Sequence, residues 1–572
     1  MHVKITQSGS RRYVQLVESY RDENGRPKKR TVATLGRVEQ LQDELDTVIT
    51  GLLKLVGRDA KLGPAFPAAA QCSFEPARAY GDVWALTQLW QELGFNDLQR
   101  LFRRTRHSIE VEALIRLMVF NRLCDPESKL GTLRWLGTVA LPDLDVTSVL
   151  HQHLLRAMDA LEAQREDVDR VLAGLLRPMV DRELSVVFYD LTTIRAEGSS
   201  EQAGDLRQYG MSKEGIVARQ ILLGVVQTAE GLPIYHEVFD GNVAETRTLL
   251  PTLRLLLERF PAIQRLVLVA DRGLLSLDNL AQLQALRLRD NQPLEFILAV
   301  PARRYNEFTD QLQAWHEATC RDAQIEVLHE QPWQQLRLVA AHDPERASEQ
   351  REARQRRLAE LLALGEQWAQ KLDRQDGGQR ARGRALSHSG AKARFYRDVS
   401  EAHLLKTLKV DLKGDWFSYD VDEAALARAE QMDGKLILLT NVPDMTAAEV
   451  VQRYKSLADI ERGFRVLKNE IEIGPIYHRL PERIRAHAAI CFMALILYRV
   501  MRMRLKQRGL SLSPEAALAR LQQIQYHQVK FDPSRPAVRG VGTINAAQHE
   551  ALRGLGLQAP KLAGKMTLLP VV

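Results

Sequence analysis

Three acidic residues stand where carboxylates could carry out metal-assisted chemistry. Asp190 lies inside the apolar run Phe-Tyr-Asp-Leu-Thr-Thr, where a carboxylate is costly to bury and requires a partner or a metal ion. Asp271 follows a second apolar run, and Glu461 lies in a helical pattern. Mg²⁺ prefers oxygen ligands, and two ions about 3.5–4 Å apart can activate a nucleophile and stabilise a leaving oxygen at phosphorus. Each residue alone could instead be a cap, a turn former or part of a charged surface.

Alternating strands and helices are predicted to position these carboxylates. Residues 185–194 form a short apolar strand that holds Asp190, and residues 265–270 form the strand that ends before Asp271. Three early strands with short turns, followed by alternating helix and strand, indicate a mixed sheet flanked by helices. The other expected strands are 221–228, 234–239, 296–300 and 435–441, and the expected helices are 246–260, 276–286, 446–469 and 483–506.

Four segments together resemble the DDE transposases of bacterial insertion sequences, and more narrowly their IS-four-like branch. They are Tyr189-Asp190-Leu191-Thr192-Thr193, Gly241-Asn242, Ala270-Asp271-Arg272-Gly273 and a helix with that branch's spacing of Tyr, Arg, Glu and Lys. In the helix, Tyr454, Glu461 and Lys468 occupy the expected positions, whereas Leu457 stands where Arg is usual. The resemblance covers about residues 185–500, with a long insertion between the second Asp and the Glu.

The resemblance implies an RNase H-like fold in which Asp190, Asp271 and Glu461 are catalytic and bind Mg²⁺, with Mn²⁺ as a substitute. It implies cleavage of double-stranded DNA at the terminal repeats of the element, followed by strand transfer into target DNA. It also implies a homodimer, because two ends must be joined together. Two alternatives stay open. One is an RNase H-like nuclease without strand transfer, and the other is a DNA-binding protein derived from a transposase that has lost catalysis.

Cations around the glutamate are the expected DNA contacts. On one continuous helix, positions 454, 457, 461, 465 and 468 fall on one face, because the steps are three or four residues. Lys468 is then expected to pair with a phosphate and Tyr454 to hydrogen-bond one. We hypothesise that Arg453 or Arg465 replaces the guanidinium missing at position 457, although a solvated charged face explains both arginines equally well. Arg272 is expected to hold phosphate or to form a salt bridge.

Residues 303–433 are predicted to form an insertion domain that handles DNA. The stretch from Arg374 to Arg397 is expected to be a loop, and its seven Lys and Arg residues against one acid make it a candidate phosphate-binding surface. The tryptophans of this region could stack on an unpaired base, although most tryptophans are core residues. The four tryptophans are Trp315, Trp333, Trp368 and Trp416.

The helix predicted to begin at residue 483 ends in a further basic stretch, which has five cations and no acid between Arg499 and Arg508.

Composition excludes several other classes of protein. Hydrophobic residues make up 45% of the chain and charged residues 26%, which is typical of a folded protein rather than a disordered one. The longest apolar run, from Ala488 to Tyr498, is shorter than the about 20 residues of a membrane span and therefore predicts a buried helix. No signal peptide is expected, and four scattered cysteines argue against zinc sites and disulfides. The scattered cysteines suit the cytosol, and the resemblance implies the bacterial cytoplasm and association with the nucleoid.

At 572 residues the chain is long enough for about three to five domains. A β-rich basic module is expected at residues 1–62, with strands at 13–20 and 31–35. A helical region is expected at residues 63–184, and its first residues form a linker. The catalytic core is expected at 185–302 and 434–510, split by the insertion, with a C-terminal extension at 511–572. The net charge of +7 is small, but it conceals local basic clusters. Which domain reads the ends stays open, as does the excision route.

Overall fold

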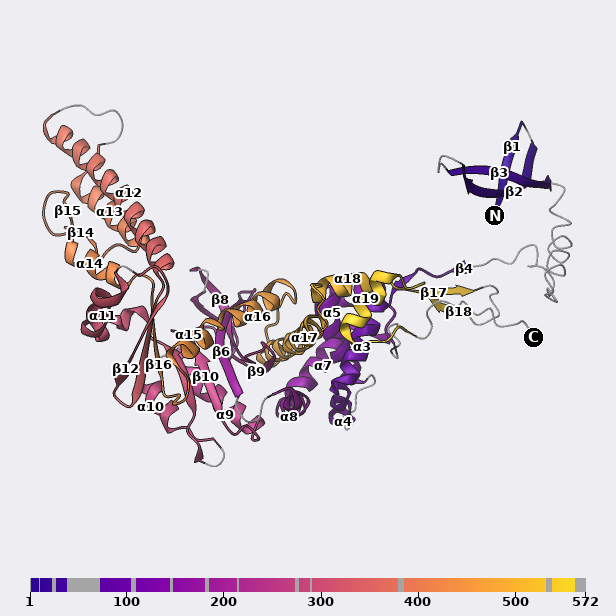
Figure 1. The fold of residues 1–572 in the computed structure, drawn as a ribbon, viewed down its shortest axis with the longest axis horizontal. Helices are drawn as coiled ribbons and strands as arrows, with labels where there is room; N and C mark the ends of the chain where they lie inside the picture. Colours follow the sequence, from indigo (N-terminus) through magenta and orange to yellow (C-terminus); the bar gives the residue numbers. More distant parts are fainter. Residues whose placement is uncertain are drawn as a thin grey trace. The chain divides into compact units, whose positions relative to one another are not determined.

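The structure is a computed structural model of the 572-residue chain, shown in Figure 1. It divides into two compact units, which are described separately: residues 1–77, 526–542 and 562–572, and residues 78–525 and 543–561. The structure describes residues 2–9, 11–22, 27–38, 73–103, 110–142, 144, 148–180, 185–212, 215–272, 277–288, 291–321, 323–378, 385–530 and 537–560.

The first unit begins with an antiparallel sheet in the order β1-β2-β3. Its strands are β1 (His2–Ser8), β2 (Arg11–Arg21) and β3 (Pro27–Arg37). The two predicted strands are confirmed as β2 and β3, whereas β1 was not predicted. The linker predicted at the start of the region 63–184 lies outside the described residues.

The first part of the second unit is mainly helical, as predicted. Three of its helices, α3 (Gly81–Glu92), α5 (Val111–Cys124) and α7 (His151–Ala163), pack against one long apolar helix, α17 (Pro481–Gln507). By length and composition α17 could cross a membrane, but 89% of its most apolar window is buried inside the protein. The prediction of a buried core helix is therefore confirmed. The same part of the unit also contains α4 (Leu98–Phe102), α6 (Lys129–Leu136) and α8 (Arg165–Leu176).

A nine-stranded mixed sheet forms the centre of the second unit, which confirms the predicted mixed architecture. The strand order is β12-β13-β16-β11-β10-β6-β8-β7, and β9 also pairs with β8. Only the β6–β10 and β10–β11 pairs are parallel. The strands are β6 (Ser185–Arg195), β7 (Gln208–Met211), β8 (Val217–Thr228), β9 (Pro233–Asp240), β10 (Leu266–Ala270), β11 (Glu295–Ala299), β12 (Val327–Trp333), β13 (Leu336–His342) and β16 (Lys435–Thr440).

Helices cover both faces of this sheet. Asp190 pairs with Val225 and Val225 with His236, so these three side chains share one face. His236 stacks on Phe492 of α17 at 4.4 Å between ring centroids, which places α17 on that face. Tyr189 points the other way, toward Thr252 of α9 (Leu249–Arg259). Asp190 therefore faces the layer that contains the helices from the C-terminal part of the chain.

The region predicted as an insertion contributes β12 and β13 to this sheet and continues as a helical hairpin with its own apolar core. Its first helix, α12 (Pro344–Asp376), begins at a proline and is capped by the side chain of Asp343. The predicted loop from Arg374 to Arg397 is wrong in part, since α13 (His388–Glu401) begins within it. Alanine, lysine and arginine favour helix once Ser387 provides a cap. Residues 379–384 of this stretch lie outside the described residues.

The single helix predicted at 446–469 is also wrong. The structure has two helices, α15 (Ala447–Lys455) and α16 (Ala458–Asn469). At the break, the Ser456 hydroxyl donates to the carbonyl of Gln452 at 3.0 Å, and Leu457 is buried. A serine that bonds back to the preceding turn bends a helix, and a buried leucine fixes the bend in the core. Position 457 therefore contributes packing, where the resemblance led us to expect an arginine.

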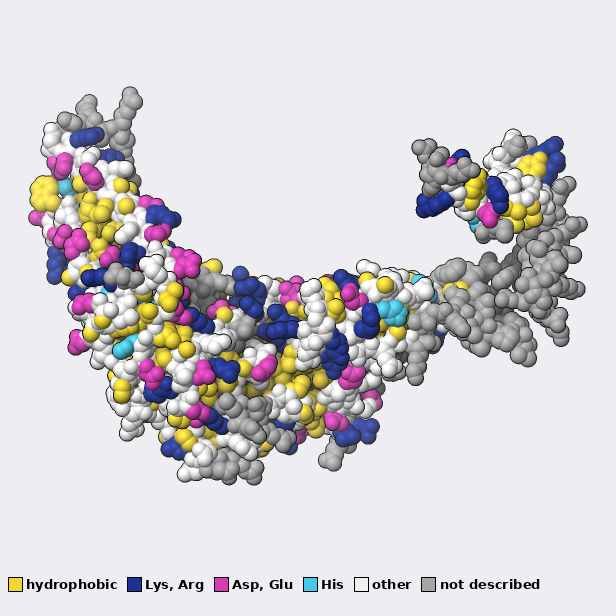
Figure 2. All heavy atoms as spheres, in the orientation of Figure 1, with side chains coloured by type: hydrophobic (Ala, Val, Ile, Leu, Met, Phe, Trp, Pro, Cys, Tyr) yellow, Lys and Arg dark blue, Asp and Glu magenta, His cyan; other side chains and the backbone are white. Residues whose placement is uncertain are grey.

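Charged side chains of both signs are mixed on the face of the second unit that Figure 2 draws. Figure 2 shows Lys and Arg side chains interspersed with Asp and Glu over the visible face of this unit. The predicted basic stretch from Arg499 to Arg508 belongs largely to α17, and its first member is buried. On this face charge alone marks no binding surface, so we identify one from the residues around a site.

Candidate active site

Parallel pairing of β6 with β10 brings Asp190 and Asp271 together. The register sets Ala270 beside Tyr189, and each aspartate is the next residue along its chain. Neighbouring strands are about 4.7–4.9 Å apart, so the two carboxylates occupy adjacent positions where β10 ends. Asp190 is buried and its Oδ1 accepts from the amide of Leu191 at 2.7 Å, whereas Asp271 is half-buried. The pair offers hard oxygen ligands at one edge of the site.

Tyr454 orients the second aspartate. Its hydroxyl, from α15, donates to Oδ1 of Asp271 at 2.7 Å. Burial and the charge of Asp271 raise the pKa of Tyr454 above its ordinary value, so the phenol keeps its proton and remains a donor. The sequence predicts that Tyr454 binds a phosphate, and that role stays a prediction. In the structure its hydroxyl donates a hydrogen bond to the Asp271 carboxylate.

Glu461 lies on a neighbouring helix and not within the pair. It lies exposed in the first turn of α16, a helix that contacts both β6 and α17. Among the described residues, no three His, Cys, Asp or Glu side chains gather closely enough to hold a metal ion. The structure therefore brings two of the three predicted carboxylates together and carries the third on a neighbouring helix.

A glycine sets how closely α16 approaches the sheet. A Cβ added at Gly463 would lie 2.6 Å from Nε2 of Gln227 in β8 and 3.0 Å from a terminal nitrogen of Arg499 in α17. Gln227 is fully buried, and neither polar atom of its amide has a hydrogen-bond partner among the described residues. Sequence reasoning missed Gln227, Gly463 and Arg499 as supports of the site. A glycine inside the helical pattern was the available signal.

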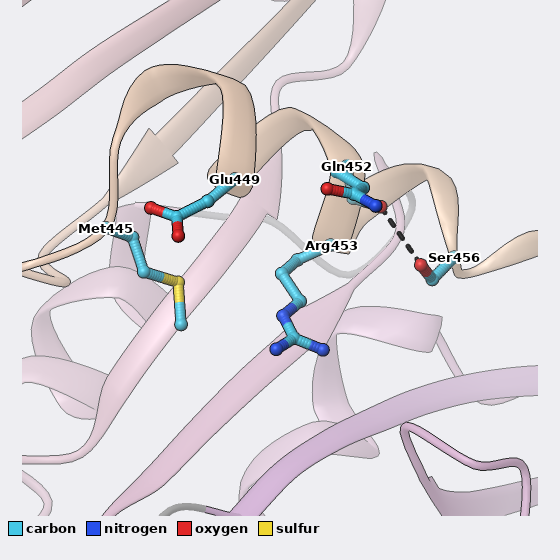
Figure 3. Close-up of a pocket in the computed structure, with 5 residues that line it drawn as sticks. All are labelled: Met445, Glu449, Gln452, Arg453 and Ser456. Atoms are coloured by element: carbon cyan, nitrogen blue, oxygen red, sulfur yellow. Dashed lines mark hydrogen bonds between the residues drawn. The ribbon is translucent and has the colours of Figure 1, made fainter.

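The predicted cationic residues fall in different surroundings. Arg465 is exposed one turn after Glu461, and Lys468 is half-buried in the last turn of α16. Arg453 belongs to α15, where it lines a pocket of about 240 Å³ that also contains Glu449 (Figure 3). Arg272 is half-buried beside Asp271. Arg465 thus shares a helix with the candidate glutamate, while Arg453 lies next to a carboxylate.

Two histidines and three tryptophans are structural. Burial lowers the pKa of His236 to about 3 and that of His487 well below its ordinary value, so both rings are neutral. Trp315, Trp333 and Trp368 pack against neighbouring side chains, Trp315 under the ammonium of Lys435 at 5.1 Å. Of the four tryptophans considered for base stacking, Trp416 is the one with a largely exposed ring, at 66%.

Two family models match parts of the chain. A family model described as the transposase DDE domain matches residues 181–497, which is more than half of the chain. A second model, the N-terminal domain of IS1634 family transposases, matches residues 2–62. No curated protein matches the chain.

Replacing Tyr454 by Phe removes the donor to Asp271 and leaves the ring. If Asp271 binds a divalent ion, its carboxylate loses an orienting hydrogen bond, and affinity for Mn²⁺ should fall about 10–100-fold. Titration of Mn²⁺, followed by its electron paramagnetic resonance signal, measures this change. Tyr396→Phe, at a more exposed tyrosine in α13, should leave the titration unchanged. Equal Mn²⁺ affinity in the Tyr454→Phe and wild-type proteins would contradict the orienting role.

Replacing Gly463 by Ala should push α16 away from the sheet, because the new methyl group meets Gln227. Overpacking of this kind costs about 1–3 kcal/mol. Amide hydrogen exchange should therefore become faster in α16 and remain slow in β6. Gly174→Ala is the matched control, since nothing lies within 4 Å of a Cβ at that helical position. Unchanged exchange in α16 would show that the helix tolerates a side chain at position 463.

Proposed function

Because the chain belongs to the family of DDE transposases of insertion sequences, we propose that it cleaves DNA at the ends of its element and transfers the freed strand into target DNA. Family membership establishes the general activity, which is that of a DNA transposase. The reaction steps, the residues that perform them and the metal ion belong to the proposal. The observation that supports these proposals is the β6–β10 register, in which Asp190 and Asp271 directly follow the paired residues Tyr189 and Ala270.

The core is proposed to be RNase H-like. Its central strands follow the order β9-β8-β6-β10-β11, with an antiparallel first half and a parallel second half. The domain boundaries expected from the sequence are retained as proposals, with the core at 185–302 and 434–510. The strands β12 and β13 extend the core sheet, so the region between these two parts is not wholly separate from it.

Asp190 and Asp271 are proposed to hold the divalent ion, Mg²⁺ or Mn²⁺, and Glu461 to complete its ligands. The donor set fits such ions, since all three groups are carboxylates and two already lie at adjacent positions. The bound ions would activate the attacking oxygen and stabilise the leaving oxygen. Tyr454 holds Asp271 in place, and the contacts at Gly463 set the approach of the helix that carries Glu461. Completing the site requires Glu461 to come closer to the pair.

The partner is proposed to be double-stranded DNA, first the terminal repeats and then the target. Lys468, Arg465 and Arg272 are the cations proposed to bind its phosphates near the carboxylates, with Tyr454 and Arg453 as further candidates. Joining two ends requires two active sites, so a homodimer is proposed for the synaptic complex. The protein is proposed to act in the bacterial cytoplasm, on DNA of the nucleoid.

Strand transfer distinguishes this function from the two alternatives. Wild-type protein, element-end DNA, a target plasmid and Mg²⁺ or Mn²⁺ should give joined products, whereas Glu461→Gln and Asp190→Asn should give none. Gel analysis of labelled end DNA measures cleavage and joining separately. Glu472→Gln, at an exposed glutamate beyond α16, is the matched control and should retain activity. Cleavage without joining would favour a nuclease, and binding alone an inactive DNA-binding protein. Full activity of Glu461→Gln would exclude it as a metal ligand.

Arg465→Ala should weaken binding to end DNA more than Arg453→Ala. Loss of one phosphate contact should lower affinity and reduce the salt slope by about 1. Arg453 lies beside Glu449, which already offsets its charge. Fluorescence anisotropy over a range of salt concentrations measures both quantities. If neither substitution changes binding or cleavage, then neither arginine replaces the one missing at Leu457.

A further inference from the structure

A pocket of about 280 Å³ lies where α5 and α16 end and where α3 and α18 (Pro514–Gln522) begin. The described residues that line it include acidic side chains but no Lys, Arg or His. Three of these acids are Asp82 in the first turn of α3, Glu470 directly after α16 and Glu515 in the first turn of α18. We call this the acidic pocket. Nothing in the proposed chemistry uses it.

The C-termini of two helices add negative charge to the acidic pocket. Leu123 and Cys124 are the last two residues of α5, and Asn469 is the last residue of α16. The free carbonyls at the end of a helix carry partial negative charge and favour a cation nearby. Arg122 and Lys468 belong to the last turns of these helices, but neither lines the pocket. The pocket therefore presents negative charge to anything that enters it.

Asp82 is a buried carboxylate without an ion pair among the described residues. It lines the pocket, is 1% exposed, and its Oδ1 accepts from the amide of Val83 at 2.8 Å. Its Oδ2 has no hydrogen-bond partner among the described residues, and the thiol of Cys124, which interacts with this carboxyl, is a weak donor. Burial raises the pKa of Asp82 to about 6, and no cation opposes this rise. The start of α3 thus uses one oxygen of Asp82 and leaves the other uncompensated.

The other two carboxylates are more accessible to solvent. Glu470 is exposed and Glu515 is half-buried. Burial and the charge of Glu515 raise the pKa of Glu470, so these two groups act on each other. Leu123, Pro126 and Leu518 provide apolar wall in the same pocket. The pocket therefore combines one deeply buried carboxylate, two accessible ones and apolar surface.

We propose that the acidic pocket binds an aliphatic diamine or polyamine, with one ammonium at Asp82 and a second at Glu470 and Glu515. Ammonium groups donate charge-assisted hydrogen bonds to carboxylates, while methylene segments pack on apolar wall. The volume is just below the about 300–1,000 Å³ of pockets for drug-sized molecules, so it suits a smaller ligand. A metal ion fits less well, because no three His, Cys, Asp or Glu side chains gather closely enough in the described parts of the chain. The inference goes beyond the proposed function and does not depend on it.

Isothermal titration calorimetry of the full chain without DNA tests this inference, with diaminobutane, butylamine and Mn²⁺ as probes. Diaminobutane should bind saturably and about ten-fold more tightly than butylamine, which lacks the second ammonium. Asp82→Asn keeps the size of the side chain and should weaken diaminobutane about 10–100-fold, because a hydrogen bond between charged groups is lost. Ala519→Phe places a large side chain at an exposed lining position and should block binding without removing a charge. Glu349→Gln, at an exposed glutamate of α12, is the control and should bind like wild type.

Thermal unfolding without ligand shows which variants are folded, and Asp82→Asn should unfold no earlier than wild type, because it removes a buried, unpaired charge. Absence of saturable diaminobutane binding to wild type overturns the inference. Equal affinity of wild type and folded Asp82→Asn also overturns it, and if that variant does not fold, equal affinity of Ala519→Phe does so. Mn²⁺ binding that is lost in Asp82→Asn, without binding of diaminobutane, would assign the pocket to a metal ion instead. Because the titrations contain no DNA, their failure leaves the proposed cleavage and strand transfer intact.

Discussion

The parallel pairing of β6 with β10 is the constraint on which the rest of the site depends. It places two carboxylates on adjacent strands, one of them inside an otherwise apolar strand. Two negative charges at this spacing repel each other, so the arrangement is costly without a cation. The sheet tolerates it because β6 is held on both sides, by β10 and by β8. Pairing of β6 on both sides is thus what allows this strand to hold a carboxylate at position 190.

The break between α15 and α16 divides two tasks that one helix could not perform equally well. α15 presents Tyr454 to Asp271, while α16 approaches β8 at Gly463 and carries Glu461. Because the two segments are joined at a buried leucine, each can follow the surface beneath it. The buried amide of Gln227, without a hydrogen-bond partner among the described residues, lies where α16 is seated. The close approach at Gly463 thus fixes where α16 is seated on β8.

Sequence reasoning located the carboxylate pair because its cause is local. An aspartate within or after an apolar strand can be recognised from a few neighbouring residues. The buried helix α17 was predicted from an eleven-residue apolar run. The break at Ser456 and the strands β12 and β13 were not predicted, because tertiary contacts decide them. Helical periodicity also could not predict that Glu461 lies outside the carboxylate pair. Periodicity places residues on one side of a helix, but it does not say where that helix is seated.

The strand order has a consequence for synthesis of the protein. β16 lies between β11 and β13, yet the ribosome makes it about 135 residues after β11. At about 5–20 residues per second, the edge of β11 waits roughly 7–30 s for its neighbour. An unpaired apolar edge invites pairing with other chains. The nascent protein is therefore expected to need protection by chaperones during this interval, and chains terminated within it would expose the same edge permanently.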